Sequence, residues 1–241
     1  LKARANPNIQ GEKGYTALIW SSWNGHIEIV RLILAWRLRT KHGELRAKVD
    51  VNIKNNFNET ALMKACTYGY VEIASMLVQS GADVNVSKVN GDTALYLACG
   101  KGYLEVVRLL IQANADVNPQ NNKQYTPLMA ACSIGHLEIV QSLLKAKANI
   151  FIKDYVGKTA LARACYHGNT EVVQELIQAG ADLNTVDKYG SSPLLEASSM
   201  GHLEVVQLLV NARADTTLRN KDGKTYKDMM NSFSQNRKGE L

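Results

Sequence analysis

Four cysteines are the residues of this sequence with the widest range of possible chemistry. They end four related phrases, TALMKAC, TALYLAC, TPLMAAC and TALARAC, as Cys66, Cys99, Cys132 and Cys165. Thiols at regular intervals could bind a metal ion, form a redox device, or be the small side chain that a repeated unit needs at one position. The interval between successive cysteines, which is the same each time, decides among these interpretations.

The same interval organises most of the chain. A hydroxyl residue ahead of an apolar segment recurs at this interval, after a longer first one, at Thr16, Thr60, Thr93, Thr126, Thr159, Ser192 and Thr225. Such a residue is a typical helix N-cap, and Pro127 and Pro193 suit the first helical position. A glycine about nine residues later suits a left-handed C-cap, and segments such as HLEIVQSLL have apolar residues at helical spacing. Turn formers follow, so each unit is predicted to be helix, turn, helix and projecting loop.

The period of about 33 residues and the phrases TPL, GHLEIV and GADVN resemble the ankyrin repeat, over nearly the whole chain. The resemblance implies an all-α ankyrin-repeat solenoid of helix-turn-helix units with projecting β-hairpin loops. We expect the end of a preceding repeat at 1–10, a repeat at 11–54 with an insertion at 37–47, repeats at 55–87, 88–120, 121–153, 154–186 and 187–219, and a degenerate C-terminal capping repeat with a tail at 220–241. Because residue 1 matches the last turn of a second helix, we expect the chain to have been cut from something longer.

The repeat decides the role of the cysteines. Stacked helices lie about 8–10 Å apart, whereas a disulfide requires Cα atoms within about 7 Å. Zinc needs thiolates about 2.3 Å from a single ion, which a linear series cannot supply. Ser22 and Ser198 occupy the same position in the flanking units, which indicates a requirement for small size. We therefore expect buried, reduced thiols.

No residue grouping predicts catalysis. His26, His136 and His202 belong to the repeated phrase GHxE, and no HExxH spacing occurs. The phrases VGKT and DGKT resemble the end of a phosphate-binding loop, but Ile152 and Leu218 stand where that motif requires glycine. We expect no enzyme, no cofactor and no metal site.

Charge and hydropathy suggest where the protein acts. The net charge of +6 comes from two segments, 37–47 and 219–241, so a broad nucleic-acid-binding face is not expected. No apolar run approaches the roughly 18 residues of a membrane-spanning helix, and the first residues do not resemble a signal peptide. We expect a monomer located in the cytoplasm or the nucleus.

The resemblance also implies a binding surface. In the ankyrin family, variable side chains of the loops and first helices line a concave groove. The predicted partner-binding residues at matching positions are Tyr15, Trp20, Trp23, Phe57, Glu59, Lys64, Tyr68, Asp92, Lys101, Lys123, Tyr125, Lys158, Arg163 and Tyr166. Aromatic residues dominate the first part and basic residues the later part. We therefore expect a protein or extended peptide with an apolar anchor and acidic residues.

Alternatives remain open at this point. The chain could be a regulatory or targeting module of a larger enzyme or channel, or it could bind RNA or another polyanion through its Tyr and Lys residues. The insertion 37–47 could lengthen a helix or form a basic loop, either merely solvated or docking an acidic partner or a membrane surface. Asn58 and Gln124 replace a loop glycine, which leaves the geometry of two loops open. The resemblance further implies that asparagines of the DVN phrase, Asn52, Asn85 and Asn118, can be hydroxylated.

Overall fold

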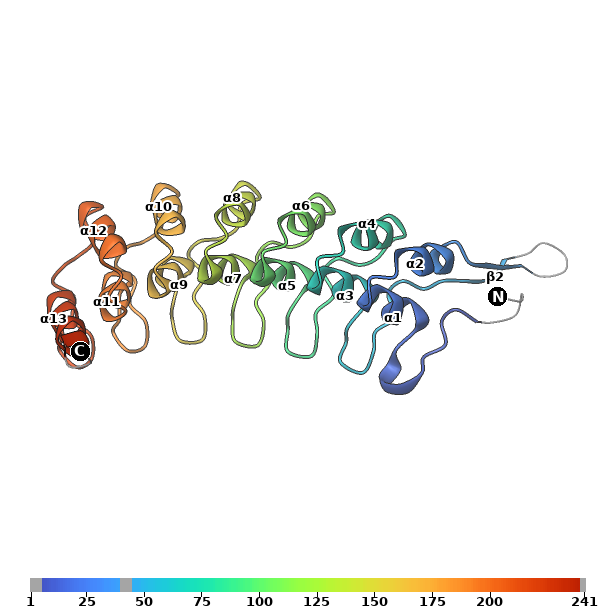
Figure 1. Ribbon diagram of the computed structural model, residues 1–241, viewed down its shortest axis with the longest axis horizontal. Helices are drawn as coiled ribbons and strands as arrows, with labels where there is room; N and C mark the ends of the chain where they lie inside the picture. The colour runs from blue at the N-terminus through green and yellow to red at the C-terminus, as the bar shows by residue number, and fades with distance from the viewer. Residues whose placement is uncertain (1–5, 40–44, 239–241) are drawn as a thin grey trace. The chain divides into compact units, whose positions relative to one another are not determined.

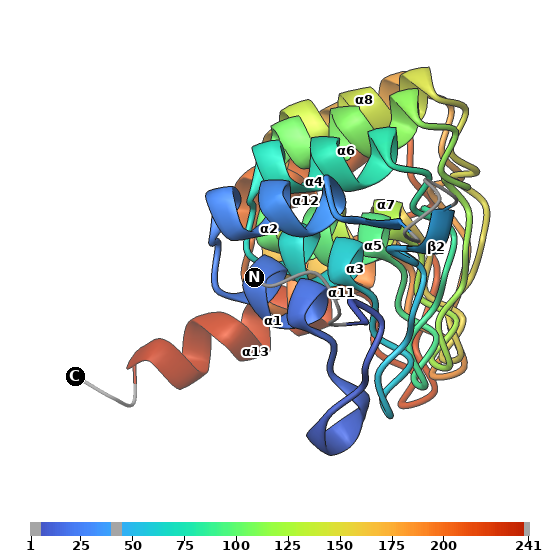
Figure 2. The same ribbon diagram turned by 90° about the vertical axis from the view of Figure 1, so that its right-hand side faces the viewer.

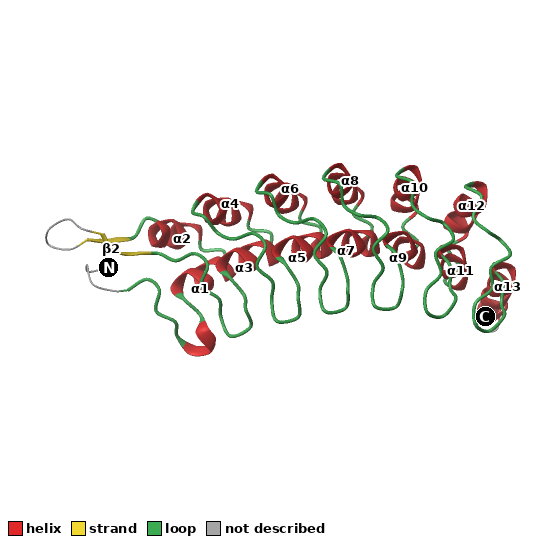
Figure 3. Cartoon of the chain, turned by 180° about the vertical axis from the view of Figure 1, so that it is seen from behind, coloured by secondary structure: helices red, strands yellow, loops and turns green. Residues whose placement is uncertain are grey.

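The computed structural model describes residues 6–39 and 45–238. The chain forms two compact units, residues 1–116 and 117–241. Within each unit the helices come in pairs: the first helices form one row, the second helices form another, and the loops project past the first row (Figures 1 and 3). This is the expected all-α arrangement of helix-turn-helix units.

The N-terminal unit contains three helix pairs. A short 3-10 helix, η1 (Glu12–Gly14), lies in the first loop. The pairs are α1 (Ala17–Trp23) with α2 (Ile27–Leu34), α3 (Ala61–Thr67) with α4 (Val71–Gln79), and α5 (Ala94–Lys101) with α6 (Leu104–Gln112).

The C-terminal unit contains three further pairs and a single helix. The pairs are α7 (Pro127–Ile134) with α8 (Leu137–Lys145), α9 (Ala160–His167) with α10 (Thr170–Gln178), and α11 (Pro193–Ser199) with α12 (Leu203–Asn211). The single helix, α13 (Tyr226–Lys238), packs against α11 at the position of the predicted capping repeat.

Caps fix the ends of the first helices as the sequence predicts. The hydroxyl oxygen of Thr60 accepts a hydrogen bond from the Met63 N–H at 3.2 Å, and the first helix of every pair begins in the same way. Gly69 follows α3 with φ 75°, and a Cβ on it would lie 2.8 Å from the Tyr103 ring. Glycine therefore satisfies both the left-handed turn and the close approach of the next repeat.

The loops are hairpin-like in both units. The Asn55 N–H donates to the Glu59 carbonyl at 3.0 Å across one loop, and the Val89 N–H donates to the Phe57 carbonyl at 3.2 Å between neighbouring loops. Asn58 and Gln124 each have φ 59°, in the same left-handed region as the glycines of the other loops. The two substitutions therefore leave the turn unchanged, since asparagine in particular adopts this conformation at modest cost.

Asparagine side chains tie consecutive repeats together. The Asn52 Oδ1 accepts a hydrogen bond from the Asp83 N–H at 2.8 Å, and Asn184 accepts one from the Asp215 N–H at 2.8 Å. Asn85 and Asn118 make the equivalent bonds. Phe151 occupies this position in one repeat and cannot accept such a bond. The DVN phrase thus has a structural role of its own.

The insertion does not lengthen the second helix of its repeat. Strands β1 (Arg37–Arg39) and β2 (Leu45–Lys48) pair in antiparallel register as a small hairpin, with a bulge after Leu38. The prediction of a longer helix is wrong because α2 ends at Leu34, well before the basic residues. The tip of the insertion, 40–44, lies outside the described residues.

Candidate functional site

Three aromatic side chains form a stack at the first helix of the N-terminal unit. Trp20 and Trp23 lie one turn apart on α1, and their ring centroids are 5.0 Å apart at 20°. Tyr15, directly before the N-cap, stacks on Trp23 at 5.6 Å and contacts Trp20 at 5.0 Å. Tyr15 is buried, whereas Trp20 is 49% exposed. The helix thus presents a flat indole to solvent on an aromatic base.

A charged network from the second repeat supports this stack. The Lys64 Nζ lies 4.5 Å above the Trp23 ring centroid and 2.6 Å from the Glu59 Oε2. Glu59 also pairs with Lys88 at 3.4 Å. Burial raises the pKa of Glu59, but hydrogen bonds from Lys64 and Asn55 and the two lysine charges outweigh it, so the pKa falls below its usual value. Glu59 is therefore ionised at neutral pH and holds Lys64 in place.

The remaining predicted residues of the N-terminal unit differ in accessibility. Phe57 is exposed near a loop tip, and Tyr68 is exposed at the end of α3, where it stacks on Tyr70 at 6.1 Å. Lys101 is exposed at the end of α5. Asp92 is buried and accepts a hydrogen bond from the Asn90 amide at 2.8 Å. Trp20, Phe57 and Tyr68 are therefore the accessible aromatic residues of this set.

In the C-terminal unit, the partly buried Arg163 forms an ion pair with the buried Asp154. Its Nε donates to the Asp154 Oδ2 at 2.9 Å, and its second guanidinium nitrogen contacts the same oxygen. The guanidinium carbon lies 4.5 Å from the Tyr125 ring centroid. Burial raises the pKa of Tyr125, with Asp154 and Tyr155 adding to the effect and Arg163 opposing it. Arg163 on α9 thus holds the loop at Asp154 against the helix.

Lys158 is neutralised in a similar way by the next repeat. Its Nζ lies 2.8 Å from the Glu196 Oε1 and 3.9 Å from the Asp187 Oδ2. It also lies 4.9 Å from the Tyr166 ring centroid. Lys123, in contrast, is exposed. Most of the positive charge predicted for this part of the surface is therefore balanced inside the molecule.

Sequence reasoning missed the acidic partners of these basic residues. Asp154 precedes Arg163 within one repeat, whereas Glu196 belongs to the repeat that follows Lys158. Glu196 occupies the same repeat position as Lys64 and Arg163, in the first turn after the N-cap. A signal was present in the opposite charges at corresponding loop and helix positions. The fold of one repeat brings Arg163 to Asp154, whereas the packing of adjacent repeats brings Lys158 to Glu196.

Comparisons with known proteins agree with the repeat fold of this chain. The family described as ankyrin repeats (3 copies) matches residues 1–88, 86–154 and 128–220. The chain belongs to the ankyrin-repeat family. The crystal structure of the human ASB11 ankyrin repeat domain is similar to this chain, with 28% identity and a TM-score of 0.76 over 89% of this chain and 91% of that one. A search of curated proteins found no match.

The thiols of these ankyrin repeats have the structural role expected for them. Cys66, Cys99, Cys132 and Cys165 are fully buried. Burial raises the pKa values of Cys66, Cys132 and Cys165 far above the usual thiol range. These three side chains are therefore protonated at neutral pH and not nucleophilic.

Within residues 6–39 and 45–238, no three His, Cys, Asp or Glu side chains lie together as metal ligands would. Over the same described part of the ankyrin array, no helix has the length and hydropathy needed to span a membrane.

Proposed function

We propose that this chain binds a partner protein or extended peptide through the loops and first helices of its N-terminal unit, with Trp20 as the central anchor. Ankyrin repeats are generally protein–protein interaction modules, and the chain belongs to that family. The proposal adds a place on the molecule and a kind of partner to that general role.

The aromatic stack is the observation that carries this proposal. A solvent-facing indole costs free energy in water, and large aromatic side chains dominate the energetics of interfaces. Here the rings of Tyr15 and Trp23 pack against Trp20. Lys64, paired with Glu59, lies over the Trp23 ring and orders it. A side chain that is already ordered loses little conformational entropy on binding.

The surface favours an apolar segment over a highly acidic one. Glu59 already balances Lys64, and Trp20, Phe57 and Tyr68 offer exposed aromatic surface. Acidic residues of a partner would find an exposed cation at Lys101 in this unit. We therefore expect a partner segment with at least one large apolar side chain and few carboxylates.

The polyanion alternative has less support from the geometry. Lys158 and Arg163 are cations beside the tyrosines that would stack on bases, and both are paired with carboxylates. An approaching phosphate would meet those carboxylates as well as the cations. We expect binding to RNA to be weak and to decline steeply with salt.

Peptide selection provides a direct test. Short peptides are selected on the wild-type chain from a random library, and their Kd values are then measured against Trp20→Ala by fluorescence anisotropy. Loss of a buried aromatic anchor costs about 2 kcal/mol or more, so we expect the Kd to rise at least tenfold. We also expect less than about a threefold change in Kd between low and high salt, because few phosphate-like contacts form.

Tyr189→Ala is the matched control, because Tyr189 is an exposed aromatic residue of the C-terminal unit. Its Kd should change less than about twofold. Both variants are first checked for unchanged circular dichroism. Equal affinity of the selected peptides for wild type and Trp20→Ala would refute the proposed anchor.

A further inference from the structure

The outer face of the first helix pair is exposed where all later pairs are buried. Ile29 on α2 is 48% exposed, whereas Ile73, Val106, Ile139, Val172 and Val205 at the same repeat position are at most 1% exposed. Ala17 on α1 is likewise exposed, while Ala61 and Ala94 are buried. Figure 2 looks onto this end of the N-terminal unit, with α1 and α2 in front of α3 and α4.

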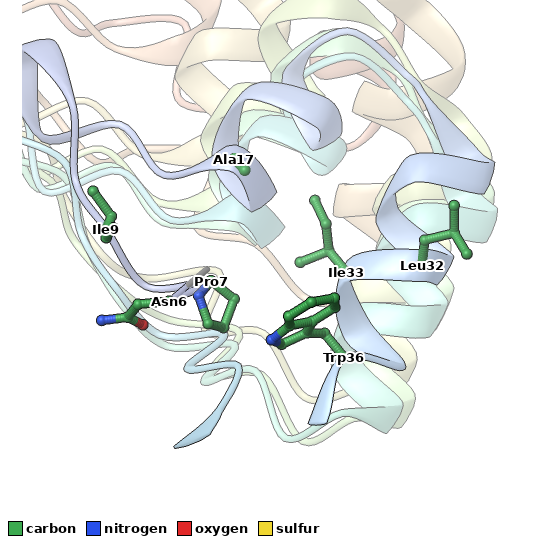
Figure 4. Close-up of a pocket in the computed structure, with 7 residues that line it drawn as sticks. All are labelled: Asn6, Pro7, Ile9, Ala17, Leu32, Ile33 and Trp36. Carbon is green, nitrogen blue, oxygen red and sulfur yellow. The ribbon is translucent and has the colours of Figure 1, made fainter. Parts of the chain in front are cut away.

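A hollow of about 190 Å³ lies on this face. Its walls come from both helices, from the segment before them and from Trp36 after α2. The lining residues are Asn6, Pro7, Ile9, Ala17, Leu32, Ile33 and Trp36 (Figure 4). Its lining is almost wholly apolar, and Leu32 is 64% exposed. The indole N–H of Trp36 is buried and has no hydrogen-bond acceptor among the described residues. The hollow therefore suits apolar side chains together with one carbonyl oxygen.

The segment at residues 6–10 follows the path of a repeat's end. The Asn8 Oδ1 accepts a hydrogen bond from the Asp50 N–H at 2.9 Å, just as Asn52 does from Asp83 one repeat later. The Asn8 amide also donates to the Lys48 carbonyl at 2.9 Å. The inter-repeat asparagine series thus extends to the N-terminal side of α1 and α2.

We propose that the exposed face of α1 and α2 binds one further helix pair of ankyrin type, continuous with residues 6–10. Within the N-terminal unit, α3 and α4 pack on α1 and α2 and are packed upon by α5 and α6. The face of α1 and α2 away from α3 carries the same apolar positions that receive a neighbour in those inner pairs. The added pair fills the hollow with apolar side chains and supplies a backbone carbonyl to Trp36.

An extended chain tests this assignment. A copy of residues 50–77, which hold α3 and most of α4, is joined before Leu1, so that together with residues 1–5 it completes one repeat unit. Hydrogen exchange then reports whether the added amides are protected. We expect protection of about 100-fold or more in the added helices, and a higher Tm for the extended chain than for the chain as it stands.

Ile29→Asp tests whether the added helices use the proposed face. In the chain as it stands, this partly exposed position should tolerate the change, with a Tm shift of only a few degrees. In the extended chain, protection of the added helices should fall about tenfold or more, because a carboxylate would be buried at the contact. Leu203→Asp, at an exposed apolar position of α12, is the control and should leave protection unchanged.

Three outcomes would overturn the assignment. The added helices could remain unprotected, or their protection could survive Ile29→Asp. Alternatively, the chain without extension could form dimers in light scattering that Ile29→Asp abolishes, in which case a second copy covers the face.

Discussion

Residues at equivalent repeat positions serve different purposes in the two units. In the C-terminal unit, Lys158 and Arg163 are paired with Glu196 and Asp154 and hold loops against helices. In the N-terminal unit, Trp20 occupies the repeat position of Arg163 but remains half exposed. Variability between repeats therefore does not by itself identify a binding residue. A variable side chain is available to a partner only where neighbouring residues neither pair with its polar groups nor bury its apolar surface.

Removing the Asp154 carboxylate should give the largest effect. Asp154 accepts hydrogen bonds from the Val156 and Lys158 N–H groups as well as from Arg163. Asp154→Ala leaves the partly buried Arg163 guanidinium and two loop N–H groups without their acceptor, so we expect a loss of about 3–5 kcal/mol of unfolding free energy. Urea unfolding followed by circular dichroism measures it.

Asp154→Asn separates the two contributions of this side chain. It retains an oxygen for the loop N–H groups but replaces the charged oxygen that accepts from Arg163 with an NH2 group, so its cost should lie between that of Asp154→Ala and zero. A loss below about 1 kcal/mol for Asp154→Ala would mean that Arg163 is as available to a partner as Trp20.

The buried thiols should lower the unfolding free energy of both units at high pH. Because burial raises the pKa of Cys66 and Cys132, the thiols add stability below the unfolded pKa near 9.0, and this stability is lost as pH rises. We expect each thiol to cost about 1.4 kcal/mol per pH unit above that value. Unfolding free energies at several pH values on either side of it measure the slope.

Alanine variants test how much each thiol contributes to the fall of unfolding free energy with pH. Cys66→Ala and Cys132→Ala should each reduce the slope by one thiol's share, in the N-terminal and the C-terminal unit respectively. A slope that neither variant changes would show that other groups, such as Tyr125, cause the loss.

Restoring the missing asparagine should give the smallest effect. Phe151 interrupts the series in the C-terminal unit that Asn184 continues. Phe151→Asn places an acceptor near the Asp182 N–H, and we expect a gain of about 0.5–1.5 kcal/mol. Asn184→Ala, which removes an existing bond, should lose a similar amount, and thermal unfolding of both variants measures the two changes. A destabilised Phe151→Asn variant would show that the Phe151 ring packs more usefully than the bond it displaces.

Much of the fold could be predicted because each repeat carries its own local signals. Thr60 caps a helix, Gly69 follows its end with a positive φ, and the apolar residues between them recur at helical spacing. The hairpin at the insertion could not be predicted, since RLRTKHGELRA has neither a clear strand alternation nor a recognised turn. Its strand pairing depends on where α2 ends.

The candidate site was predictable only as a set of positions. The family resemblance placed Trp20, Lys64 and Arg163 at equivalent points, and nothing in their spacing distinguished an exposed side chain from a paired one. Lys64 meets Glu59 within one repeat, but Lys158 meets Glu196 across two.

The sequence alone determined the repeat, the helix pairs and the buried role of the cysteines, because these follow from local propensity and from a constant period. Tertiary structure alone decided which charges are neutralised, which aromatic rings face solvent and which end of the N-terminal unit keeps an apolar face. Exposure and ion pairing depend on distances between loop and helix side chains, both within a repeat and between neighbouring repeats, and those distances are set only when the chain folds and the repeats stack.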